Sequence, residues 1–220
     1  MSYIGSKPAN KPVVASDLDP TVITGQTALA TSPADTDEFL ISDAGVLKRL
    51  DASLIGGGKI GQVISATKTD TFTASSLSGA AAIDITGLSV AITPSATSSK
   101  ILIIYNVHGS NATAARQSSF GIRLVRGSTD ISKADAAGSR QRVTATQSIR
   151  SQDDVNQMSG LAGNFLDSPS STSATTYKIQ LININDSSVN MHINRTDGNA
   201  DDANVRPLAT SNITVMEVLA

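Results

Sequence analysis

The fold is decided by residues 177–193, which read YKIQLININDSSVNMHI. The first five residues alternate between apolar and polar side chains, and so do the last five, from Val189 to Ile193. A period of two is typical of a β-strand that buries one face. Asp186 and Ser187, which lie between the two runs, are common turn residues. The stretch therefore predicts two β-strands joined by a turn.

Similar signals recur from residue 60 to the C-terminus. No stretch has a convincing helical period, because Gly138 interrupts the best candidate, residues 134–143. About ten short strands separated by turns predict a β-sandwich or jelly roll. The expected strands cover residues 62–67, 69–74, 82–85, 88–93, 100–108, 120–126, 131–133, 143–149, 163–166, 176–184, 188–195 and 212–219.

Residues 1–35 are expected to form an extended arm. Four prolines punctuate it, and each disfavours helix at the residue before it. Its apolar residues come in pairs too short to bury a core, so the arm either orders against a partner or is a disordered tail. The candidate docking residues are Val13, Val14, Val22 and Ile23.

Residues 36–59 are expected to form a β-hairpin and a glycine-rich hinge. Two short apolar runs flank Asp43-Ala44-Gly45, a sequence that favours a tight turn. Asp51 is a suitable cap for one helical turn after the second strand. A lone hairpin is marginally stable in water, so this one should pack on a neighbour or pair with copies of itself. Residues 60–220 then form the sandwich head.

The composition excludes several classes of function. The 17 basic and 19 acidic residues are mixed along the chain, which leaves no large basic field for nucleic acid or an anionic membrane. No apolar run approaches the roughly 18 residues that membrane insertion requires. With no cysteine, disulfides and thiolate sites are absent. Only seven aromatic residues are present, and Ser and Thr fill nearly a quarter of the chain, so a monomer would have a thin core.

No arrangement of residues predicts catalysis, and the chain is not expected to be an enzyme. A nucleophilic serine needs a neighbouring base, but His108 and His192 both lie in strand patterns typical of surface or interface positions. The glycine-rich residues 56–61 lack the Lys-Ser/Thr pair of a phosphate-binding loop. No catalytic, cofactor-binding or metal-binding residue is predicted, and no cofactor.

Residues 195–206 form a polar segment that is expected to be an exposed recognition loop. The segment is dense in oxygen ligands, but its spacing does not match the EF-hand pattern, so a bound cation is only an alternative. The candidate recognition residues are Arg195, Asp197, Asp201, Asp202 and Arg206.

Two parts of the chain resemble structural proteins of tailed bacteriophages. Residues 34–50, ADTDEFLISDAGVLKRL, resemble the N-terminal region of tail fibre and other appendage proteins, especially those of marine phages. Residues 85–94, 98–103 and 213–220 are similar to the jelly-roll heads of such proteins. These heads are related in architecture to the complement and tumour-necrosis-factor trimers.

The resemblance implies an all-β, homotrimeric, non-enzymatic component of the virion, assembled in the host cytoplasm. The arm would dock onto other virion proteins, of the tail or the capsid, and the head would face a host-surface glycan or protein. The apolar run at residues 101–105 suggests a trimer interface at Ile101, Ile103 and Tyr105. The chain lacks a long fibre shaft, so a capsid decoration protein is the alternative. A carbohydrate-binding module is disfavoured by the scarcity of aromatic residues.

Overall fold

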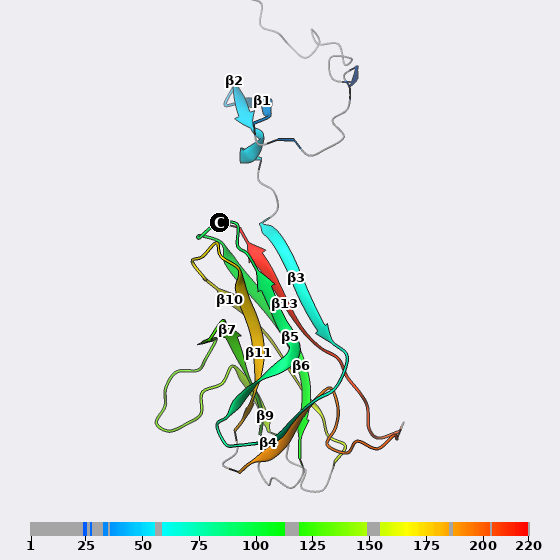
Figure 1. The fold of residues 1–220 in the computed structure, drawn as a ribbon. Helices are drawn as coiled ribbons and strands as arrows, with labels where there is room; N and C mark the ends of the chain where they lie inside the picture. Colours follow the sequence, from blue (N-terminus) through cyan, green and yellow to red (C-terminus); the bar gives the residue numbers. More distant parts are fainter. Residues whose placement is uncertain are drawn as a thin grey trace, which may run out of the picture. The chain divides into compact units, whose positions relative to one another are not determined.

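A computed structural model of the chain describes residues 24–25, 27, 33–34, 36–55, 59–112, 119–148, 155–184, 187–202 and 204–219. The chain divides into two compact units, Met1–Gly56 and Gly57–Ala220 (Figure 1). The four candidate docking residues, Val13, Val14, Val22 and Ile23, lie outside the described residues. Among the described residues, no helix has the length and apolarity that a membrane crossing requires.

The first unit contains the predicted hairpin. Strand β1 (Glu38–Asp43) pairs antiparallel with β2 (Val46–Asp51). Ala44 and Gly45 form the two-residue turn, and both have positive φ, at 50° and 82°. This is the backbone of the turn that matches the twist of a hairpin, and glycine adopts it without steric cost.

The hairpin is followed by the predicted helical turn. It is a single 3-10 turn, η2 (Ala52–Leu54), and Asp51 caps it by accepting a hydrogen bond from the Ser53 N–H at 3.0 Å. The cap satisfies a backbone donor that the short turn leaves without a partner.

The second unit is a sandwich of two antiparallel sheets. One sheet has the order β3-β13-β6-β12-β4, with β10 on the far edge of β6, and the other has the order β5-β11-β7-β8, with β9 also on β7. Its strands are β3 (Ile60–Lys68), β4 (Phe72–Leu77), β5 (Ala82–Ile92), β6 (Lys100–Asn111), β7 (Ser119–Arg126), β8 (Thr129–Ile131), β9 (Ala145–Ser148), β10 (Ser159–Asp167), β11 (Thr175–Asn183), β12 (Val189–Ile193) and β13 (Ser211–Val218).

The register makes this sandwich a jelly roll. β12 and β13 both pair with β6, at residues 109–111 and 100–106, so they lie end to end in one row. β4 and β3 pair with β12 and β13 in the same way and form a second interrupted row. If strands that lie end to end are counted as one row, each sheet has four rows. The row that contains β3 lies beside the row that contains β13, so the beginning and the end of the sandwich are neighbours, as in a jelly roll. The predicted all-β sandwich is confirmed.

One pair of predicted strands is a single strand in the structure. Residues 82–85 and 88–93 were expected to be separate, but β5 runs through both because Gly87, with φ of 90°, is accommodated within it. The register against β11 shifts between Lys178 and Gln180, which marks a bulge. A bulge bends a strand without ending it.

The core lies between the two sheets and is built mainly from aliphatic side chains. Tyr177 and Phe120 are the largest side chains that are fully buried there.

This arrangement corrects the predicted trimer interface. Ile101 and Ile103 are 0% exposed and Tyr105 is 5% exposed, because all three point from β6 into the core. They contact the opposite sheet of their own chain and are not accessible to a second copy. The outward residues of the same strand are Leu102 and Ile104, and Ile104 is 40% exposed.

Candidate interaction surfaces

The predicted recognition loop lies at the break between β12 and β13, the two strands that lie end to end beside β6. Residues 194–210 connect β12 to β13, which follow one another along the same edge of β6. The loop is closed at its base, where the Ala209 N–H donates to the Asn194 carbonyl oxygen at 3.0 Å.

The base of this loop is held by a buried amide. Asn194 Nδ2 donates to the carbonyl oxygens of Lys68 and Asp70, at 2.8 and 3.0 Å. Asn194 Oδ1 accepts from Ser211 Oγ at 2.6 Å, and both residues are 0% exposed. A buried, fully bonded amide is costly to disrupt, so the two ends of the loop are fixed to the sheet.

His192 holds the loop against the sheet. Its Nε2 lies 3.0 Å from Asp197 Oδ1 and its Nδ1 lies 3.1 Å from Thr73 Oγ1. Burial and the charge of Arg195 lower the pKa of His192, against the opposing effect of Asp197. The predicted surface or interface position is wrong for this histidine, since it is 2% exposed beneath the loop.

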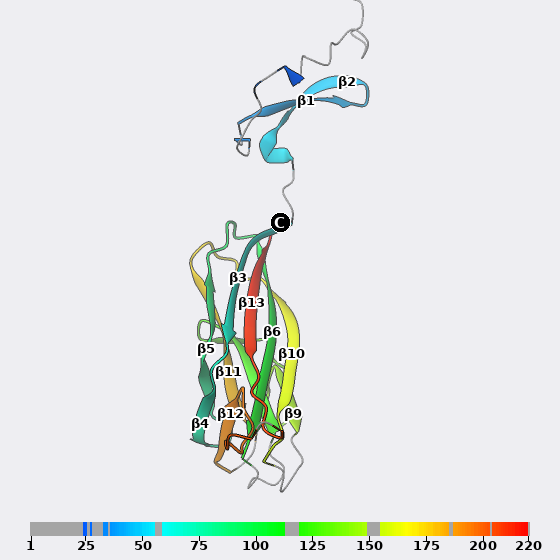
Figure 2. The same ribbon diagram turned by 90° about the vertical axis from the view of Figure 1, so that its right-hand side faces the viewer.

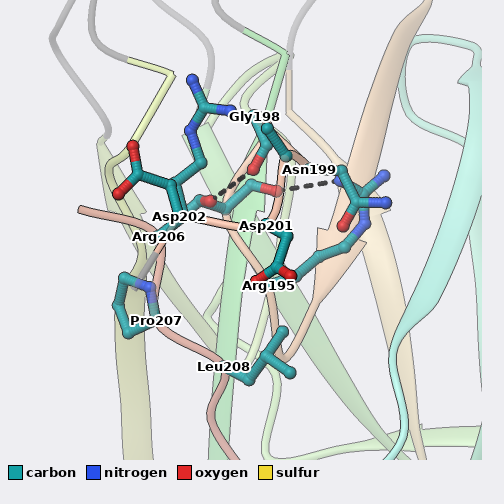
Figure 3. A pocket seen from close by; sticks show the side chains of 10 residues that line it. Arg195, Gly198, Asn199, Asp201, Asp202, Arg206, Pro207 and Leu208 are labelled. Atoms are coloured by element: carbon teal, nitrogen blue, oxygen red, sulfur yellow. Dashed lines mark hydrogen bonds between the residues drawn. The ribbon is translucent and has the colours of Figure 1, made fainter. Parts of the chain in front are cut away.

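Four of the five predicted recognition residues line a hollow in this loop. Arg195, Asp201, Asp202 and Arg206 surround a cavity of about 250 Å³ together with Thr196, Gly198, Asn199, Ala200, Pro207 and Leu208 (Figure 3). The fifth, Asp197, does not line it and instead bonds to His192. The lining combines two guanidinium groups with two carboxylates, which suits a polar ligand rather than an apolar one.

The hollow is also attached to the segment before β10. The Gly198 N–H donates to the Val155 carbonyl oxygen at 2.8 Å, and Arg206 Nε donates to Asn156 Oδ1 at 3.0 Å. A side chain at Gly198 would meet the Arg206 guanidinium at 2.9 Å, so glycine permits this close approach. In the described part of the chain, no three or more His, Asp or Glu residues gather in a way that could hold a metal ion.

A second surface was not foreseen from the sequence. The outer side of β3, β13, β6 and β10 presents three cross-strand rows of four residues, and Figure 2 shows these four strands side by side. None of the twelve is charged. The rows are Val63–Met216–Leu102–Leu166, Ser65–Thr214–Ile104–Asn164 and Thr67–Asn212–Asn106–Ala162, and together they are called the uncharged face below.

Large apolar side chains are exposed on the uncharged face. Val63 is 57% exposed, Leu166 is 47% exposed and Ile104 is 40% exposed, and each comes from a different strand. Ser65 and Thr214 share a hydrogen bond of 2.8 Å between their hydroxyl groups, so part of the polar content of the face is already paired.

The opposite sheet has a different outer face. Lys178 Nζ lies 2.7 Å from Asp84 Oδ2, and Asp130 Oδ2 lies 3.6 Å from Arg123 Nη1 and 3.3 Å from Lys133 Nζ. Charges that pair with one another within a sheet are typical of a solvated surface. The two faces of the sandwich therefore differ in chemistry.

The uncharged face could have been recognised only from the register. In the sequence its residues are alternate positions of four separate runs, and each run taken alone is an ordinary strand with some polar residues. Pairing Val63 with Met216, and Met216 with Leu102, is what assembles an apolar row.

Comparisons with known proteins give a likeness in structure only. No family model and no curated protein matches the chain. A structure of the Gt strain of infectious bursal disease virus is 12% identical, with a TM-score of 0.36 over 81% of this chain and 41% of that chain. The VP2 subviral particle of the same virus is 14% identical, with a TM-score of 0.34 over 84% and 43% of the two chains. This chain thus spans about two fifths of the viral chains that it matches.

Proposed function

We propose that this chain is a non-enzymatic structural component of a bacteriophage virion, built as a homotrimer. The N-terminal arm docks onto another virion protein, and the sandwich head faces outward. The resemblance of residues 34–50 to phage appendage proteins supports the viral role. The observation that supports the assembly of several copies is the uncharged face.

A face without charge is what an interface between copies requires. The central part of protein interfaces is depleted in charged residues, and charge is placed at the rim. Around a symmetry axis each side chain near the axis meets its own copies, so any charge there would meet its like. The uncharged face avoids this repulsion, whereas the ion pairs of Asp84 and Asp130 occupy the other sheet.

The size of the uncharged face fits part of an interface. Alternate residues along a strand are about 6.8 Å apart and neighbouring strands are about 4.8 Å apart, so the twelve residues cover an area of about 400 Å². A standard interface takes about 800 Å² from each partner, so the surrounding rim must contribute as well. Ile60, which is 45% exposed at the start of β3, is a suitable contributor to this surrounding area. Burying what remains exposed of Val63, Ile104 and Leu166 would contribute about 1 kcal/mol each.

The hollow in the 194–210 loop is the proposed contact with the host. Its mixed lining of Arg195, Arg206, Asp201 and Asp202 suits a polar partner such as a surface glycan. Loops held on a rigid scaffold commonly carry recognition, and this loop is fixed at its base and along its length.

A charge on the uncharged face tests the assembly. Ile104→Glu adds a carboxylate at an outward position of the central strand, and Ala91→Glu adds the same group to an exposed position of β5 on the other sheet. Light scattering should give a trimer mass for the wild type and for Ala91→Glu, and a lower mass for Ile104→Glu. Circular dichroism checks that both variants fold. A wild-type monomer, or an Ile104→Glu trimer, would refute this assembly.

The viral role is tested on particles. Deleting residues 1–35 should leave the trimer intact and abolish its incorporation into virions. Normal incorporation would refute the docking role of the arm. Antibody labelling of particles separates the two locations: label at the tail supports an appendage, and label across the shell indicates a capsid decoration protein instead.

A further inference from the structure

The hairpin unit lacks a core of its own. Among the described residues of β1, β2 and η2, no side chain is buried. Large apolar side chains are exposed instead: Leu40 is 73% exposed, Leu54 70%, Val46 58%, Ile55 47% and Phe39 40%. A two-stranded hairpin is at best marginally stable in water without a surface to pack on. Something must therefore cover it.

The register separates two faces of the hairpin. Phe39 lies opposite Leu50, Ile41 opposite Lys48, and Asp43 opposite Val46, so these six residues share one side. This side, called the Phe39 face below, has four apolar residues and one acid and one base that form an ion pair with each other. On the other side Leu40 lies opposite Arg49, which forms an exposed ion pair with Glu38, two residues before Leu40 on the same strand.

We infer that the Phe39 faces of neighbouring copies pack together as a small shared apolar core when the sandwich units associate. This inference rests on the proposed function, because it needs the copies to be held together. The Asp43–Lys48 pair leaves the face without net charge, so like faces meet with little repulsion.

The length of the linker favours copies as the partner. Residues 56–58 are three glycines in the sequence, the residue type with the widest range of allowed backbone conformations. The five steps from Ile55 to Ile60 span at most about 18 Å when extended. In an associated head the hairpins would share a small volume, and short linkers of this kind give effective concentrations in the mM range.

A single tryptophan can report on the Phe39 face, because the chain has none of its own. Phe39→Trp places the probe on the Phe39 face, and Leu40→Trp places the same probe on the opposite side as a matched control. In the full-length associated protein, Phe39→Trp should emit at shorter wavelength and be quenched by acrylamide several-fold less than Leu40→Trp. Added Ile104→Glu, which should separate the copies, should reduce the difference to the smaller one expected from the 40% and 73% exposure of the two positions in a single chain.

Each outcome decides the inference, and the molar mass separates it from the proposed function. If the protein is a trimer and both probes are quenched alike, the shared core is wrong and the assembly stands. If Phe39→Trp is as strongly shielded in the monomeric Ile104→Glu background as in the trimer, its cover comes from within one chain and the inference is wrong. A full-length protein that is monomeric would overturn both proposals.

Discussion

Replacing Tyr177 by Phe removes one hydroxyl group from the interior of the sandwich and leaves the ring in place. Tyr177 is 0% exposed, and its hydroxyl donates to Asp167 Oδ2 at 2.6 Å. Arg126 Nη1 donates to the same carboxylate, at 3.0 Å to Oδ1 and 2.8 Å to Oδ2. Burial, followed by the hydrogen bond and charge of Asp167, raises the pKa of Tyr177, so the hydroxyl stays protonated and remains a donor.

The expected loss follows from the kind of bond that is removed. A hydrogen bond to a charged group contributes about 1.5–3 kcal/mol. No cavity forms, because the ring remains, and Asp167 keeps its two bonds to Arg126. We therefore expect a loss of about 2 kcal/mol in the free energy of unfolding. For a chain of this size, that loss lowers Tm by about 4–8 °C.

A second tyrosine provides the matched control. Tyr105 is also buried, at 5% exposure, but its hydroxyl makes no hydrogen bond with any described residue. Tyr105→Phe should therefore change the free energy of unfolding by less than about 0.5 kcal/mol. Urea unfolding followed by circular dichroism, at one protein concentration for all variants, measures both changes. A Tyr177→Phe loss no larger than that of Tyr105→Phe would refute the argument.

Four further substitutions test other contacts of the sandwich. Gly109→Ala should cost about 3 kcal/mol or more, because its Cβ would lie 2.5 Å from Phe120 Cε2 and 2.7 Å from the His192 carbonyl oxygen. Gly127→Ala, whose Cβ meets nothing within 4 Å, should cost only about 1 kcal/mol for its positive φ, and equal urea midpoints would contradict this. The folded protein holds the pKa of His192 below 6.5, so the unfolded chain binds the proton first and stability is lost as the pH falls below that value. His192→Gln should remove that loss between pH 7 and 5 in urea titrations, and an unchanged slope would count against it. Burial alone would raise the pKa of Glu217, but hydrogen bonds from Ser95 and Gln62 hold it below 4.5, so its contribution to stability is lost as the pH falls below that value. Glu217→Gln should be less stable than the wild type at pH 7 and approach it near pH 3, and a constant difference would refute this role.

The local periodicity of the chain was enough to predict the class of fold. Tyr177, Ile179 and Leu181 alternate with polar residues, and all three are buried in β11 as that pattern indicates. The Ala44-Gly45 turn and the Asp51 cap were equally visible, because turns and caps depend on a few neighbouring residues. Four of the five recognition residues lie at one hollow because a single short loop contains them all.

Which residues form the outer surfaces depends on contacts between distant parts of the chain, and no local sequence pattern shows these contacts. Residues 101–105 are apolar on both sides, so the sequence alone did not show which side meets the opposite sheet. The structure points Ile101 and Ile103 into the core and leaves Ile104 outside.

Distance along the chain is the physical reason for the difference. An alternating pattern is set by successive residues, so the sequence by itself determined that this chain forms strands with one buried face. The pairing of Val63 with Met216, and of Met216 with Leu102, depends on how the whole jelly roll closes. Only the tertiary structure could therefore decide which residues form the uncharged face.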